Sequence, residues 1–158
     1  MTDNLAALTA TQLSDLYASG EASPVDVTRA VLDQIETHNP TLNCFCLVDA
    51  DSALATARES EVRWQKGEPL SAIDGIPASI KDLTLTKGWP QDEDAPATAR
   101  LREAGAVLTG KTTTPEFGWK GVTDNPLTGI TRNPWNPERT PGGSSGGASS
   151  ACASFMGP

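Results

Sequence analysis

The stretch Thr140–Gly157, TPGGSSGGASSACASFMG, constrains the fold more than any other part of this 158-residue chain. It holds five glycines, five serines and three alanines among 18 residues. Such a composition is typical of a flexible linker. It is equally typical of a backbone that folds tightly around something small and then enters a closely packed helix. The stretch is not repetitive, and residues 148–155 have helical character, which favours the second interpretation.

The sequence predicts further helices before this stretch, each marked by capping residues at its start or end. They are a helix capped by Thr9 or Thr11 and closed by Gly20, a helix from the cap Ser23 and Pro24 to Asn39-Pro40, a helix over 51–66 before Gly67, and a helix from the cap Asp94 to Ala104.

Three short apolar segments are strand candidates: 42–48, 75–85 and 105–111. In the second, Ile76, Ala78 and Ile80 alternate with less apolar residues. The last two segments flank a predicted helix, and the order strand, helix, strand indicates a parallel α/β sheet. No internal repeat or domain boundary is evident, so we expect residues 1–158 to belong to one domain.

Composition narrows the possible functions. Twelve basic and 20 acidic residues give a net charge of −8, which argues against a nucleic-acid partner. The apolar runs are too short to cross a membrane, and the N-terminal residues lack the layout of a signal peptide. Three cysteines suggest reduced thiols in a cytoplasmic protein. Because His38 is the only histidine, a zinc site is disfavoured, and we expect no Ser-His-Asp triad within these residues.

Lys81 lies at the end of the otherwise apolar segment GIPASIKD. Partial desolvation favours the neutral form of an amine, and a neutral lysine can act as a general base. The alternative is a surface lysine that pairs with Asp82 or another carboxylate. The segment alone leaves both interpretations open.

Two known glycine-rich motifs can be compared with residues 142–147: the nucleotide-binding P-loop and the nucleophile elbow of the α/β-hydrolases. A P-loop is excluded because no Gly-Lys-Ser/Thr follows the glycines. Residues 142–146 fit the Gly-x-Ser-x-Gly pattern of a nucleophile elbow, but that motif follows a buried strand. Here the preceding segment is NPWNPERTP, whose prolines exclude a central strand.

Three segments together, GIPASIKD, GKTTTPEFGW and TRNPWNPERTPGGSSGGAS, resemble the amidase signature family in their order. The segment GEASPVDVTRAVLDQIETHNPTLNCF is similar to the opening helices of that family. The resemblance implies an α/β fold with a mixed sheet flanked by helices on both faces. It also implies hydrolysis of a small-molecule amide by a Ser–cis-Ser–Lys triad without a cofactor or metal.

The resemblance assigns roles to individual residues. It implies that Lys81 is the catalytic base and that Ser144 is the bridging serine, preceded by a cis peptide bond. Gly142, Gly143, Ser145 and Gly146 would form the active-site loop, where backbone N–H groups reach the substrate. Lys81 is therefore expected within hydrogen-bond reach of Ser144, while Asp82 and Cys152 are expected to be structural.

Two features depart from the family pattern. The family's nucleophile is a further serine roughly two dozen residues after the bridging one, in the region of the oxyanion hole, and only 14 residues (158 − 144) follow Ser144. Lys81 and Ser144 are 63 residues apart (144 − 81), less than is usual for the family, with the shortfall at the segment 87–96. We therefore expect an N-terminal portion of an amidase domain that is inactive alone and that self-associates or needs a completing chain.

Two alternatives remain. One is a protein similar to the ammonia-generating A subunit of the glutamyl- or aspartyl-tRNA amidotransferases, although TPEFGWKGVTDNPLTG looks more like the stand-alone amidases. The other is a non-catalytic remnant with a binding or assembly role.

Overall fold

The computed structural model describes residues 4–89 and 91–158. Residues 1–3 belong to the N-terminal stretch that lacks the layout of a signal peptide, and Pro90 belongs to the segment 87–96. These four residues lie outside the described part. None of the helices in the described ranges combines the length and the apolar character that spanning a bilayer requires.

A mixed sheet lies at the centre of the fold, with strand order β1-β3-β2. β2 (Pro77–Lys81) and β3 (Val107–Thr112) are parallel and are connected through helix α4 (Pro96–Glu103), as the sequence predicts. β1 (Phe45–Val48) pairs antiparallel with β3 on its other side. All residues of β3 are buried, which makes it the central strand.

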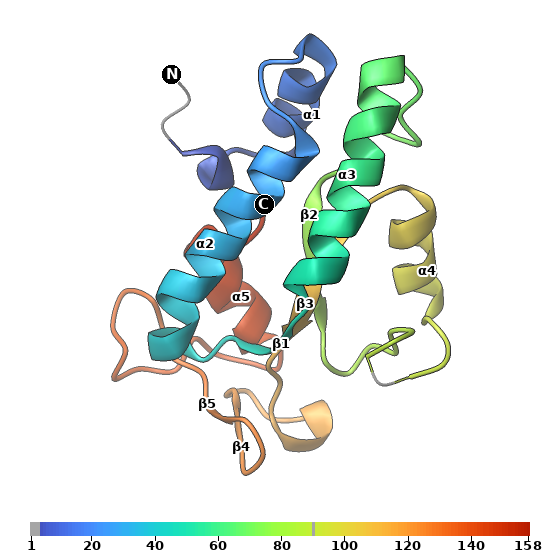
Figure 1. The fold of residues 1–158 in the computed structure, drawn as a ribbon. Helices are drawn as coiled ribbons and strands as arrows, with labels where there is room; N and C mark the ends of the chain where they lie inside the picture. The colour runs from blue at the N-terminus through green and yellow to red at the C-terminus, as the bar shows by residue number, and fades with distance from the viewer. Residues whose placement is uncertain (1–3, 90) are drawn as a thin grey trace.

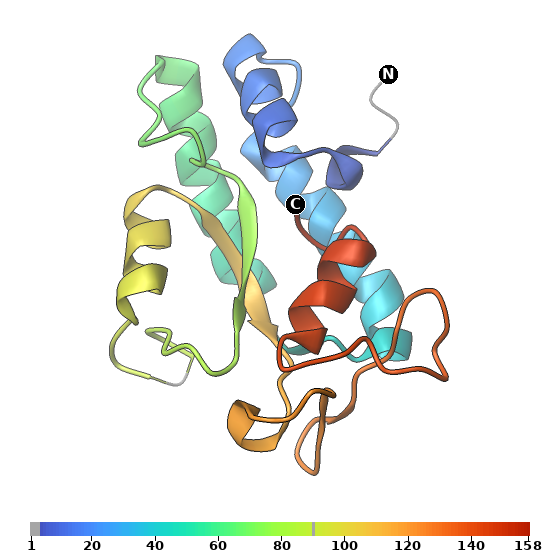
Figure 2. The same ribbon diagram turned by 180° about the vertical axis from the view of Figure 1, so that it is seen from behind.

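Helices cover both faces of this sheet (Figure 1). Val107 of β3 packs with Val25 of α2 (Pro24–Leu42) and with Ala53 and Ala57 of α3 (Ala50–Lys66). The next residue, Leu108, packs on the opposite face with Ile80 and Trp89. Helix α5 (Gly146–Ala153) lies between α2 and the strands when the molecule is seen from behind (Figure 2). The predicted mixed α/β architecture is confirmed.

The remaining elements are short. They are the 3₁₀ turn η1 (Leu5–Ala7), helix α1 (Ala10–Ser19), the 3₁₀ turn η2 (Glu116–Gly118) and the two-residue strands β4 (Asp124–Asn125) and β5 (Gly129–Ile130). The loop-rich character after Thr112 follows from the prolines of that region.

Helix starts were predictable where the cap is local. Thr9, rather than Thr11, caps α1, and its hydroxyl accepts a hydrogen bond from the Gln12 N–H. Ser23 caps α2 in a reciprocal arrangement with Asp26. Gly20 and Gly67 end α1 and α3 in the left-handed conformation, as expected.

The predicted end of α2 at Asn39-Pro40 is wrong, because the helix continues to Leu42. A proline has a helical φ, and Asn43 in the left-handed conformation ends the helix by donating its N–H to Asn39 O. Leu42 is therefore helical, and the strand expected over 42–48 is confined to Phe45–Val48.

Three other boundaries also differ from the predictions. Asp94 does not cap α4, because its carboxylate accepts the Lys87 N–H and pairs with Arg102, so that Ala95 occupies the cap position. The strand expected over 75–85 ends at Lys81, where a turn begins. α5 starts at Gly146 rather than Ala148 and ends at Ala153 rather than Phe155.

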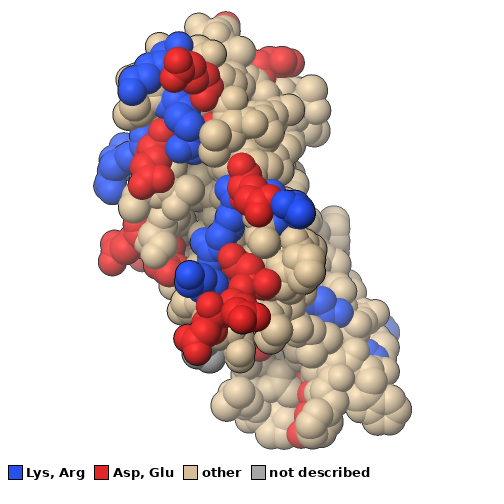
Figure 3. All heavy atoms as spheres, turned by 90° about the vertical axis from the view of Figure 1, so that its right-hand side faces the viewer, with Lys and Arg blue, Asp and Glu red and all other residues tan. Residues whose placement is uncertain are grey.

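Charged side chains are unevenly distributed over the surface. They gather over α3 and α4 on the face shown in Figure 3, and few lie on the loops at its lower end. Residues 113–158 carry three acidic and three basic side chains, so the net charge of −8 belongs to residues 1–112.

Candidate active site

Lys81 at the end of β2 meets the two serines that precede α5. Its Nζ atom lies 2.8 Å from the Oγ of Ser144 and 2.9 Å from the Oγ of Ser145. Lys81 and Ser144 are half-buried, and Ser145 is exposed. The predicted contact between Lys81 and Ser144 is present, and Ser145, which the resemblance implies assists by hydrogen bonding, is a second partner of the amine.

The backbone of residues 142–145 has the features that the sequence predicts. The peptide bond between Gly143 and Ser144 is cis. Gly142 has a φ of +89°, a conformation that residues with side chains rarely adopt. A Cβ atom on Gly143 would lie 2.8 Å from the backbone nitrogen of Val122, so a larger residue does not fit there. These glycines are required by the fold of the loop and are not a flexible linker.

Thr123, which was not identified from the sequence, holds this loop through its hydroxyl group. Its hydroxyl donates to Gly142 O at 2.9 Å and accepts the N–H of Gly146 at 3.0 Å. The side chain is 2% exposed. It therefore joins the two ends of the loop that carries Ser144 and Ser145. Nothing in the local sequence around Thr123 signals this contact.

The small residues after the loop allow α5 to contact β3 and the residue that follows it. A Cβ atom on Gly147 would lie 2.5 Å from the backbone nitrogen of Thr113. Farther along, Ala151 is buried in the core with Val31 and Phe45, and the Ser150 hydroxyl donates to Arg132 O at 2.9 Å. The close approach of α5 fixes the position of Ser144 and Ser145 opposite the end of β2.

Asp82 does not serve as the partner of Lys81. Its carboxylate lies 3.7 Å from the Nζ atom of Lys111 on β3. The alternative of a surface Lys81 paired with Asp82 is therefore wrong. Asp82 and Cys152 do not hydrogen bond to the two serines, within residues 4–89 and 91–158.

The cysteines are free thiols in the described structure. Burial raises the pKa of Cys44 to about 12, and burial likewise raises the pKa of Cys46 to about 11. Thiols with such pKa values are protonated at neutral pH and are poor nucleophiles. In the described ranges, no group of three histidine, cysteine, aspartate or glutamate side chains is arranged to hold a metal ion.

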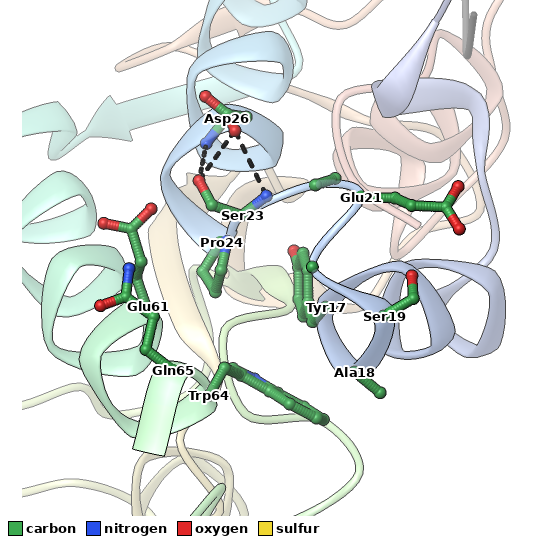
Figure 4. Close-up of a pocket in the computed structure, with 12 residues that line it drawn as sticks. Tyr17, Ala18, Ser19, Glu21, Ser23, Pro24, Asp26, Glu61, Trp64 and Gln65 are labelled. Carbon is green, nitrogen blue, oxygen red and sulfur yellow. Dashed lines mark hydrogen bonds between the residues drawn. The ribbon is translucent and has the colours of Figure 1, made fainter. Parts of the chain in front are cut away.

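A separate pocket of about 350 Å³ lies between α1, α2 and α3 (Figure 4). Tyr17 and Trp64 line it with their rings edge to face, and their polar atoms donate to backbone oxygens of Gly75 and Asp74. Neither Lys81 nor Ser144 lines this pocket. It is thus distinct from the lysine and serine cluster.

Comparison with known proteins identifies relatives over nearly the whole chain. The model of the family described as Amidase matches residues 26–158. The A subunit of the glutamyl-tRNA(Gln) amidotransferase of Thermobifida fusca is 42% identical over 163 aligned positions, which cover 96% of this chain and 33% of the relative. Its counterpart from Mycobacterium tuberculosis is 43% identical over 171 positions that cover all 158 residues, so it carries additional residues within the matched region.

Solved structures give the same result. A bacterial aryl acylamidase of the amidase signature enzymes superimposes with a TM-score of 0.87 at 32% identity, over 96% of this chain and 34% of that chain. The chain spans about a third of the length of the curated relatives that it matches.

Proposed function

The chain belongs to the amidase signature family, and from this premise we propose that Lys81 and Ser144 are two members of a triad that hydrolyses the C–N bond of an amide. The observation that carries the proposal is the 2.8 Å contact between Lys81 Nζ and Ser144 Oγ. This distance is within the range for direct transfer of a proton between the two groups.

The proposed roles follow from the chemistry of the two side chains. Neutral Lys81 accepts the proton of the Ser144 hydroxyl, while Ser144 takes the proton of a nucleophilic hydroxyl. That nucleophile attacks the carbonyl carbon of the amide, the amine leaves with a proton, and water hydrolyses the acyl-enzyme. By the family resemblance, we propose that the nucleophile is a serine that follows Ser144 in the chain.

We assign the rest of the loop to substrate binding. Gly143 is exposed and has no side chain, as a close approach of substrate to the backbone requires. Gly142 and Gly146 shape the loop on either side of it, because both are bound to the Thr123 hydroxyl. The Ser145 hydroxyl accepts a hydrogen bond from the Lys81 amine and holds the amine in place. In this proposal side chains carry the proton transfers, and the loop binds the substrate.

We further propose that residues 1–158 are the N-terminal portion of one amidase domain without an internal boundary. Large apolar side chains lie exposed on the loops after Thr112: Phe117 is 86%, Leu127 is 93% and Trp135 is 80% exposed. Phe117 and Leu127 line one surface groove with Leu83, which is 51% exposed. Contiguous exposed apolar surface is typical of a site that another chain or segment covers. The chain alone is therefore expected to self-associate or to need a completing chain.

The net charge of −8 disfavours a nucleic acid or an anionic membrane as a partner, and the small-molecule amide substrate is proposed from the family alone. The three free thiols support a cytoplasmic protein.

The second candidate function is that of one component of a tRNA-dependent amidotransferase. It is favoured by the 42% identity to the A subunit of the Thermobifida fusca glutamyl-tRNA(Gln) amidotransferase. Both candidates require hydrolysis of an amide, and they differ in whether the released ammonia is passed to a second reaction.

The test uses a fusion of residues 1–158 to the C-terminal two thirds of the Thermobifida fusca relative, which we call the completed protein. Release of 4-nitroaniline from an aryl amide measures stand-alone amidase activity, and release of ammonia from glutamine measures the activity of the second candidate. A folded completed protein that hydrolyses neither compound would contradict both functions and would favour a binding or assembly role.

A further inference from the structure

Lys111 is a buried cation that the proposed chemistry does not use. It lies on the central strand β3, and its side chain is 3% exposed. In the parallel ladder it is the neighbour of Ile80, whereas Lys81 is the neighbour of Thr112. Because consecutive residues of a strand point to opposite faces, Lys111 and Lys81 lie on opposite faces of the sheet.

The polar partners of the Lys111 amine all belong to the segment that directly follows Lys81. Its Nζ atom donates to Thr84 O at 2.5 Å and to the Thr86 hydroxyl at 3.3 Å. The carboxylate of Asp82 lies 3.7 Å away. A single ammonium group therefore contacts the first, third and fifth residues of the segment Asp82–Thr86.

This segment begins with a turn that includes Lys81. The N–H of Thr84 donates to Lys81 O at 2.9 Å, and the N–H of Asp82 donates to Thr112 O at 3.1 Å. The carbonyl of Thr84, which faces the other way from its N–H, accepts from Lys111. The segment Asp82–Thr86 is thus held at Asp82 by β3 and at Thr84 by the Lys111 side chain.

Burial of an ammonium group is unfavourable unless hydrogen bonds and an opposite charge compensate it. An apolar side chain at position 111 would suit the interior of the sheet better if stability alone decided. The cation is compensated only when Asp82, Thr84 and Thr86 adopt the observed turn. The charge of Lys111 therefore favours one conformation of the segment that ends β2.

We propose that Lys111 is a positioning residue for Lys81. It fixes the Asp82–Thr86 turn and thereby holds the Lys81 amine between the hydroxyls of Ser144 and Ser145. The value of this positioning for catalysis rests on the proposed function. The positioning itself is a property of the 158-residue chain and can be measured without turnover.

The experiment measures how fast each lysine amine of the 158-residue chain is methylated by formaldehyde and cyanoborohydride, with peptide mass spectrometry as the readout. Lys66, at the exposed end of α3, is the internal reference. The variants are Lys111→Met, which removes the charge, Lys111→Arg, which retains it, and Asp82→Asn, which removes the opposite charge at an exposed side chain. Circular dichroism checks that each variant is folded.

In the parent, Lys81 is expected to react more slowly than Lys66, because two serine hydroxyls hold its amine. Lys111→Met is expected to accelerate methylation of Lys81 about tenfold, as for the loss of a hydrogen bond to a charged group, without a change at Lys66. Lys111→Arg is expected to restore slow methylation at least in part.

If Lys111→Met does not fold, Asp82→Asn decides, and the proposal requires faster methylation of Lys81 in that variant. An unchanged rate of Lys81 methylation in folded Lys111→Met would overturn the proposal. If Lys111→Met is unfolded, an unchanged rate in Asp82→Asn would overturn it. Neither result bears on the proposed amide hydrolysis, which is tested separately with the completed protein.

Discussion

The Nζ atom of Lys81 lies 2.8 Å from the Oγ of Ser144, although 63 residues separate the two in the sequence. β2 ends at the lysine, and the loop before α5 carries the serine. The contact depends on how closely α5 approaches the sheet, because the serine side chain is short and the loop before α5 sets the position of its hydroxyl. Predictions about the site therefore concern both the side chains and the packing of α5.

The two serines that contact Lys81 are expected to differ in importance. In the completed protein, Ser144→Ala should lower kcat/KM for an aryl amide about 100-fold to 10,000-fold, since the path of the proton is interrupted. Ser145→Ala should lower it about tenfold, since one hydrogen bond to the lysine is lost. Equal losses, or a larger loss for Ser145→Ala, would show that the bridging role is assigned to the wrong serine.

Gly147→Ala should destabilise the chain, because the added Cβ would lie 2.5 Å from the backbone nitrogen of Thr113. Overpacking of this kind typically costs about 1–3 kcal/mol in the free energy of unfolding. Gly121→Ala is the matched control, because its Cβ would meet no atom within 4 Å. Urea denaturation measures both. A Gly147→Ala midpoint equal to that of Gly121→Ala would contradict the close packing of α5.

Stability should decrease in acid through Asp74. Burial alone would raise the pKa of Asp74, but hydrogen bonds from the Arg63 guanidinium and the Leu70 N–H outweigh it, so that its pKa lies below the ordinary value. A carboxyl group whose pKa is lower in the folded state stabilises the fold above its unfolded pKa of about 3.9. This contribution is lost as the pH falls through the folded-state pKa.

Urea denaturation between pH 6 and pH 3 measures this effect. Asp74→Asn should be less stable than the parent at pH 6 by about 3 kcal/mol, because it leaves Arg63 without its buried partner. It should also lose less stability on acidification than the parent does. Parallel pH profiles of the two proteins would show that Asp74 is not the titrating group.

The 158-residue chain alone should not hydrolyse amides. Residues of a catalytic unit act together, and a lysine with a bridging serine has no nucleophile to activate. Exposed Phe117, Leu127 and Trp135 should cause self-association. Sedimentation is expected to show species larger than the 16.5 kDa monomer. A monomer that melts cooperatively and shows saturating amidase kinetics would refute this prediction and would make Ser144 or Ser145 a candidate nucleophile.

Much of the fold could be predicted from local sequence. Thr9 and Ser23 cap their helices through residues three positions away, so the signal lies within one turn. The strand, helix, strand order before Thr112 predicted the parallel pairing of β2 and β3. Asp94 was assigned wrongly because Arg102, on the helix itself, and the backbone of Lys87 compete for its carboxylate.

The site could be predicted only in part, and through resemblance. The motifs around Lys81 and Ser144 pointed to a contact across 63 residues, which no local pattern encodes. Thr123 and Lys111 were missed because their partners lie 19 to 29 residues away, in segments whose approach depends on the tertiary fold. The glycines were noticed from composition, but the atoms that exclude their side chains became evident only in three dimensions.

In the proposed mechanism, Lys81 is the base that acts through Ser144. The most direct test compares the kcat/KM of the completed protein with those of Lys81→Ala and Lys81→Arg, using release of 4-nitroaniline from an aryl amide. We expect hydrolysis by the parent and a loss of about 100-fold to 10,000-fold in both variants, because alanine has no amine and arginine remains protonated and cannot accept a proton. Hydrolysis by either variant at a rate near that of the parent would contradict it.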